Sequence, residues 1–195
     1  MQGIKTTPNK KVKKSEEPAG KDSVPSVDDV ELEGEKDDKV PVYDTCDDVR
    51  KKINAHLKKP GVTQAAFLRA ASTSFHNPPK TLNARQLSAF RSKKGPSNGN
   101  TSGIFYGAYV YFQKLRIKEG KPKSNKRQEM EEIHAKDGGL DTKHMQDRLT
   151  TLAGDHWYHD AYGRTILNGE VLLCERRATG AWLSGTDLNA MNADA

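Results

Sequence analysis

The chain of 195 residues is poor in cysteine and tryptophan, with two of each. Its cysteines, Cys46 and Cys174, lie far apart and form no C-x-x-C motif, which indicates a reducing compartment where free thiols are normal. No apolar run approaches the roughly 20 residues that a membrane-spanning helix needs. Residues 1–8 also lack the apolar core of a signal peptide. These absences predict a soluble intracellular protein with no membrane partner.

Sequence motifs of catalysis are missing as well. The chain has no nucleophile elbow, and the glycines between Gly95 and Gly103 lack the Lys-Ser/Thr pair that ends a phosphate-binding P-loop. Four histidines fall within a window of 26 residues, but no paired metal-ligand motif accompanies them: His134, His144, His156 and His159. We therefore expect a protein that is not an enzyme and that uses neither a cofactor nor a metal.

Hydrophobic residues are too few for one dense core, at 34% of the chain with a mean hydropathy of −0.85. Residues 1–42 are rich in Lys, Asp, Glu, Pro and Ser and show no periodic apolar pattern, so we expect a disordered tail there. Within this tail, Lys10-Lys11-Val12-Lys13-Lys14 has the composition of a nuclear-import signal. This cluster favours a location in the nucleus.

Charge is distributed unevenly along the chain. The formal net charge is +6. Residues 1–45 carry a net −3 and residues 137–195 a net −4, whereas residues 46–136 hold 19 basic and 6 acidic side chains, a net +13. A compact basic segment between acidic flanks is typical of a protein that binds a polyanion. The alternative is that the charge serves solubility alone.

The clearest helical pattern spans residues 102–118. Apolar side chains recur there at steps of three and four residues along one face: Phe105, Ala108, Tyr109, Phe112 and Leu115. Tyr106, Val110 and Ile117 form a second apolar stripe beside the first. Because a helix with so much apolar surface must be covered by other elements, we predict that it is the central helix of a small bundle.

Capping residues predict four further helices. The first begins near Thr45, with two aspartates in its first turn, and stops at Pro60-Gly61. The second follows Thr63, with Phe67 and Leu68 as its apolar anchors. The last begins at Ser124 and runs through His134.

The third of these helices has the strongest start signal in the sequence. Asn83 and Gln86 have the spacing of a capping box, and Leu82 and Leu87 have that of a hydrophobic staple. Leu87 and Phe90 are expected to face inward, which leaves a solvent-facing row of Arg85, Ser88, Arg91 and Ser92.

Three helices in succession, the third with exposed arginines, resemble the helix-turn-helix class of DNA-binding domains. In that class Arg85 would contact a guanine edge, while Arg91, Lys93 and Lys94 would bind phosphates. Asn83 and Gln86 are sufficiently explained as caps. The connection over residues 72–82 departs from the class, because it contains two prolines and exceeds the roughly 3–4 residues usual there. The alternative, a helical domain that binds nucleic acid through charge alone, is therefore also consistent with the sequence.

The basic residues after the central helix complete the candidate interface. We predict nucleic-acid binding by nine side chains: Arg85, Arg91, Lys93, Lys94, Lys118, Lys121, Lys123, Lys126 and Arg127.

A different pattern follows in the C-terminal part. Residues 165–167 and 170–174 flank Asn168-Gly169, which is a strong signal for a β-hairpin with a type I′ turn. The fold predicted for the whole chain is mainly α: a small helix-turn-helix-like bundle with a disordered N-terminal tail and a small C-terminal β-hairpin. The predicted divisions are a tail over 1–42, a basic helical domain over 43–136, and a loop with the hairpin extension over 137–195.

Several stretches of the predicted helical domain resemble a fungal family of domains of unknown function. They are Asp48-Val49-Arg50-Lys51-Lys52-Ile53, Gln64-Ala65-Ala66-Phe67-Leu68-Arg69, Phe90 with Lys94-Gly95-Pro96, and 109–116 followed by 118–124. The resemblance covers about residues 45–143. It implies a helix-turn-helix-like fold in a fungal nuclear protein and supplies no catalytic residues.

Composition, pattern and resemblance together predict a nuclear nucleic-acid-binding protein, with DNA favoured over RNA and a role in transcription or chromatin. The alternative is a protein-interaction module whose basic face meets an acidic partner.

Overall fold

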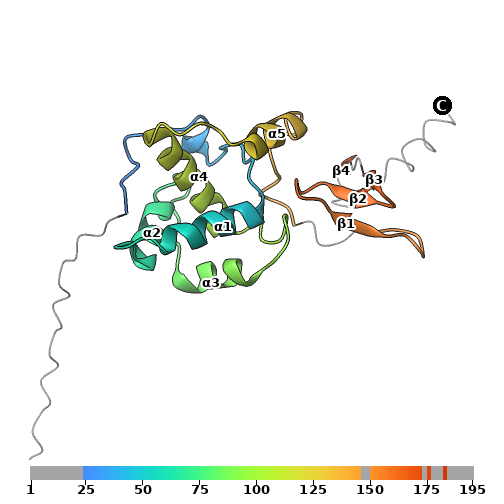
Figure 1. Ribbon diagram of the computed structural model, residues 1–195, viewed down its shortest axis with the longest axis horizontal. Helices are drawn as coiled ribbons and strands as arrows, with labels where there is room; N and C mark the ends of the chain where they lie inside the picture. The colour runs from blue at the N-terminus through green and yellow to red at the C-terminus, as the bar shows by residue number, and fades with distance from the viewer. Residues whose placement is uncertain (1–23, 146–149, 173–174, 177–181, 184–195) are drawn as a thin grey trace, which may run out of the picture.

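The computed structural model describes residues 24–145, 150–172, 175–176 and 182–183. A group of helices is followed by short strands (Figure 1), which confirms the prediction of a mainly α fold with a small C-terminal sheet. The helical elements are η1 (Glu35–Asp37), α1 (Cys46–Leu57), α2 (Gln64–Ser72), α3 (Ala84–Ser92), α4 (Gly103–Lys118) and α5 (Asn125–Ile133). The strands are β1 (Trp157–His159), β2 (Thr165–Leu167), β3 (Glu170–Val171), β4 (Glu175–Arg176) and β5 (Trp182–Leu183).

Helix α4 is the centre of the bundle, as its two apolar stripes predict. It packs against α1, α2 and α3, and every residue from Ile104 to Tyr111 is buried. Gly107 lets α2 approach closely, because a Cβ at this position would lie 2.7 Å from the backbone oxygen of Ala71. Phe112 is only partly buried, with its ring stacked on that of Phe67.

Local capping explains where the helices begin. The side chains of Thr45, Thr63 and Ser124 accept hydrogen bonds from backbone N–H groups in the first turns of α1, α2 and α5. In α3 both bonds of the capping box form between Asn83 and Gln86. These short-range bonds satisfy N–H groups that a helix start otherwise leaves without partners.

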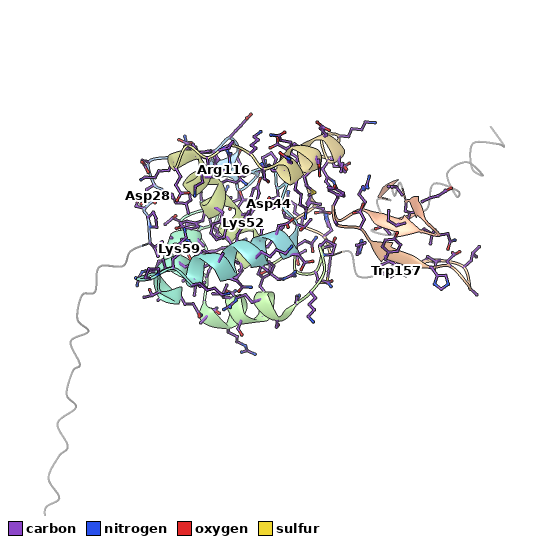
Figure 2. The ribbon with its side chains drawn as sticks, in the orientation of Figure 1. Asp28, Asp44, Lys52, Lys59, Arg116 and Trp157 are labelled. Carbon is purple, nitrogen blue, oxygen red and sulfur yellow. The ribbon has the colours of Figure 1, made fainter. Side chains whose placement is uncertain are left out.

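The N-terminal segment corrects one prediction. Residues 24–42, assigned to a disordered tail, pack against the helical core, and Val27, Val40 and Val42 belong to that core. The buried carboxylate of Glu35 forms an ion pair with the buried ammonium of Lys114 in α4. The segment also leads to Asp44, which accepts a hydrogen bond from Lys52 of α1 (Figure 2). Residues 1–23, including the Lys10–Lys14 cluster, lie outside the described residues.

Strands β1, β2 and β3 form an antiparallel sheet in sequence order. Asn168 and Gly169 both have positive φ, at 51° and 92°, as the two central positions of a type I′ turn require. The sheet contacts α5, because the Tyr162 hydroxyl donates to Glu129 at 2.8 Å and the His134 ring bonds the Tyr162 carbonyl at 3.0 Å. The predicted hairpin is confirmed for residues 165–172, and its last residues, 173–174, lie outside the described part.

Candidate nucleic-acid interface

Helix α3 lies on the outer edge of the helical group (Figure 1). Leu87 and Phe90 are its only buried residues, as predicted. Helical periodicity places Arg85, Ser88 and Ser92 on the opposite side, and all three are exposed. Because serine is small, this outward face allows another surface to approach the helix closely.

Arg50 of α1 holds the end of α3 in place. This buried side chain donates to the backbone oxygens of Phe90 and Gly95, each at 3.0 Å, and to that of Asn98. Its guanidinium also lies 4.8 Å from the centre of the Phe90 ring. It thereby satisfies carbonyl groups at a helix end that has no capping glycine. Sequence reasoning missed Arg50, because its position in a run of charged residues gave no sign that it is buried.

The cations of α3 and of the segment after it have no carboxylate partner among the described residues. Within the part of the chain that the structure describes, the exposed side chains of Arg85, Lys93 and Lys94 form no ion pair or hydrogen bond. Among the same described residues, Arg91 bonds only a neutral group, through a hydrogen bond of 2.8 Å from its Nε to Oδ1 of Asn54. We refer to Arg85, Arg91, Lys93 and Lys94 as the unpaired cations.

The other five predicted site residues are in a different electrostatic state. Each has a carboxylate oxygen within hydrogen-bonding distance, and we refer to them as the paired cations. The pairs are Lys118 with Asp29 at 2.9 Å, Lys121 with Glu119, Lys123 with Glu131 and Arg127 with Glu131 at 2.7 Å, and Lys126 with Asp48 at 2.5 Å. Ion pairing of this kind neutralises the local field that would attract a phosphate.

Arg127 is the most constrained of the paired cations. Its guanidinium lies 4.8 Å from the centre of the Tyr43 ring and donates to the Tyr109 hydroxyl at 2.5 Å. With the bond to Glu131, these contacts attach α5 to the bundle. Burial alone would lower the pKa of Arg127, but Tyr109 and Glu131 outweigh it and raise that pKa. Arg127 is therefore a structural residue rather than a free contact for a ligand.

Two of the carboxylates that pair with this region, Asp48 and Glu131, remain charged at neutral pH. Burial would raise the pKa of Asp48, but hydrogen bonds from Lys126 and Thr45 outweigh it and hold that pKa below its usual value. For Glu131, the hydrogen bonds from Lys123 and Arg127 likewise outweigh burial and lower the pKa.

The connection between α2 and α3 occupies residues 73–83, well beyond the length usual in a helix-turn-helix motif. Phe75 and Leu82 from this connection are buried in the core. The backbone N–H groups of His76 and Asn77 donate to the carboxylate of Asp38. The connection is therefore an integral part of the bundle, and it separates α2 from α3 more than a tight turn would.

Among the described residues, the side chains of the histidine-rich stretch do not come together in a single site. His134 bonds a carbonyl, His144 pairs with Asp141, and His159 bonds the Thr165 hydroxyl. No group of three or more potential metal ligands occurs in the described ranges. In the same ranges, no helix has the length and apolar character needed to cross a membrane.

Residues 40–122 match a family described as a domain of unknown function, DUF7726. The match covers less than half of the chain, and it spans α1 to α4. All four unpaired cations fall inside it, whereas Lys123, Lys126 and Arg127 fall outside. No curated protein and no solved structure matches the chain.

Proposed function

We propose that this protein binds duplex DNA through α3 and the Lys93-Lys94 segment that follows it. The observation that carries the proposal is the presence of four cations on one exposed helix and its end, with no carboxylate paired to any of them among the described residues. Phosphate contacts by free Lys and Arg side chains supply most of the sequence-independent affinity for DNA.

The shape of α3 suits this role. With its side chains, a helix is about 10–12 Å across, and the major groove of B-DNA is about 12 Å wide. Apart from Arg85, the outward row consists of the small side chains of Ser88 and Ser92, so the helix can approach base edges closely. In this arrangement Arg85 contacts a guanine edge, whereas Lys93 and Lys94 bind phosphates at the end of the helix.

The proposal extends to location and origin. A nuclear protein of a fungus, with a role in transcription or chromatin, agrees with the Lys10–Lys14 cluster and with the family resemblance of the helical region. The role proposed is binding rather than catalysis. An acidic protein is the second candidate partner, and the long α2–α3 connection favours it, because that connection differs from the one typical of DNA-binding helix pairs.

A titration of the full chain with labelled duplex DNA, duplex RNA and an acidic peptide at low salt tests the proposal. We expect tightest binding to duplex DNA, weakening steeply with salt because bound phosphates release counterions. The isolated fragment 46–136 is unsuitable, since it lacks Val27, Val40 and Val42 of the core. Absence of DNA binding at low salt contradicts the proposal, and binding of the acidic peptide alone supports the second candidate.

The role of Arg85 is tested in the same assay. Replacing it with Ala should lower the preference for the best sequence by about 1–3 kcal/mol, if this side chain contacts a base edge. An equal loss of affinity for all sequences would instead identify Arg85 as a phosphate contact.

A further inference from the structure

A hollow of about 500 Å³ opens beside α3, between the C-terminal half of α1 and the start of α2. Its lining comprises two apolar side chains, two amides and two cations: Leu57, Val62, Asn54, Gln64, Lys58 and Arg91. Among the described residues, no acidic one lines it. Its chemistry therefore suits an anion that carries several hydrogen-bond acceptors.

The two cations of the hollow differ in how they are held. Arg91 is oriented by its Nε–H bond to Asn54, which leaves the N–H groups of its two terminal nitrogens available to a ligand. Lys58, the C-cap residue of α1 and one turn after Asn54, is exposed and forms no ion pair within the described residues. A planar guanidinium and an ammonium thus line one space, and a guanidinium fork suits phosphate oxygens.

We propose that this hollow seats one backbone phosphate of the DNA that α3 contacts. The inference rests on the proposed function, because Arg91 belongs to the same helix as Arg85. If α3 enters a groove with Arg85 facing the bases, the backbone strand on the α1 side passes over the flank that carries Asn54 and Lys58. Lys93 and Lys94 then contact the DNA backbone at the end of α3. Phosphate contacts at two places, the hollow and the end of α3, fix the orientation of the helix.

Each residue of the hollow has a defined task in this account. Arg91 and Lys58 bind the same phosphate, so their contributions should not add when both are removed. Asn54 is a positioning residue, since it orients the Arg91 side chain and carries no charge of its own. Its loss should weaken binding without changing the number of counterions released.

Salt titrations of full-length variants with duplex DNA test the proposal. Because we propose that the hollow holds its phosphate only with both cations present, Lys58→Gln and Arg91→Gln should each lower the slope of log affinity against log salt by about 0.9. When the salt is raised from 50 to 200 mM, the factor by which the affinity of each variant falls should then be about threefold smaller than the factor for the wild type. The double variant should lose little more than either single one. The matched control is Lys59→Gln, just beyond the C-cap of α1 (Figure 2) but outside the lining of the hollow, and it should leave the slope unchanged.

Two substitutions of Asn54 separate positioning from charge. Asn54→Leu should weaken binding with an unchanged salt slope, whereas Asn54→Asp should weaken it more, because a carboxylate would occupy the phosphate seat. Thermal melting verifies that each variant is folded.

The outcomes distinguish this inference from the proposed function. No duplex binding by the wild type at low salt overturns both. Wild-type binding with equal slopes for Lys58→Gln, Arg91→Gln and the Lys59→Gln control overturns the hollow alone. Additive losses in the double variant would show that the two cations bind separate phosphates, which also contradicts a single seat.

Discussion

The two basic regions of this protein look alike in sequence and differ in their partners. In the α3 region, the buried Arg50 bonds backbone carbonyl groups and the carboxylate of Asp47, whereas the unpaired cations of α3 and its end have no carboxylate partner among the described residues. In the α4–α5 region, Arg127 and its neighbours bond carboxylates, and every predicted site residue there is paired. The comparison teaches that a count of lysines and arginines locates basic sequence, whereas the position of the acids decides which basic surface can attract a polyanion.

The largest effect is expected from Arg50→Ala. This substitution leaves the backbone oxygens of Phe90, Gly95 and Asn98 without their buried donor. It also removes the ion-pair partner of Asp47, at 2.6 Å. We expect a loss of about 3–5 kcal/mol in the free energy of unfolding, as for other buried charges whose partners are separated. Urea denaturation measures it. A loss below about 1 kcal/mol, typical of a surface site, would contradict the role of Arg50 in holding α3.

Arg127→Ala should have a smaller effect, because Glu131 keeps Lys123 as a partner. The substitution removes the guanidinium from between Tyr43 and Tyr109 and loosens α5, at about 2 kcal/mol of unfolding free energy. DNA binding, measured well below the melting temperature, should keep the wild-type salt slope. A flatter slope would show that Arg127 contacts phosphate directly, and the two regions would then not differ as stated.

Removing acids should convert the paired region into a binding surface. Asp29→Asn with Glu119→Gln frees Lys118 and Lys121. Introduced into a Lys93→Ala/Lys94→Ala protein, these changes should restore a salt slope of about one to two units, without sequence preference. The assay is the same salt titration. The control for net charge is Glu33→Gln with Glu132→Gln, which also removes two negative charges, at exposed acids for which no ion pair occurs among the described residues. If the control restores binding equally, net charge rather than pairing separates the two regions.

The smallest effect concerns acid stability. The folded-state pKa of Glu131 is below its usual value of 4.5, so its contribution is present above that pH and is lost as pH falls through the lowered pKa. Glu131→Gln should therefore flatten the fall in urea midpoint below about pH 4.5. The Lys93→Ala/Lys94→Ala protein should keep the wild-type curve, because no carboxylate pairs with those lysines among the described residues. Parallel curves for wild type and Glu131→Gln would contradict the pairing.

Local signals in the sequence predicted the helices and the turn. Thr45, Asn83 with Gln86, and Asn168-Gly169 act over three or four residues, so their roles follow from spacing alone. The central position of α4 in the bundle could also be predicted, because its apolar residues outnumber those of the other helices.

Tertiary contacts account for what the sequence did not show. Residues 24–42 are so rich in acids that their three core valines form no periodic pattern. Lys118 and Asp29 are 89 residues apart, and Lys126 and Asp48 are 78 apart, so no sequence window connects them. The i,i+4 spacing of Arg127 and Glu131 was the one readable sign of pairing in this region.

The central claim is that the unpaired cations of α3, and not the paired cations of α4 and α5, bind the polyanion. The most direct measurement is the salt dependence of duplex DNA affinity for two proteins of equal net charge, Lys93→Ala/Lys94→Ala and Lys121→Ala/Lys123→Ala. We predict that the first has a slope about two units flatter than the wild type and that the second keeps the wild-type slope. Equal flattening in both proteins, or flattening only in the second, would contradict the claim.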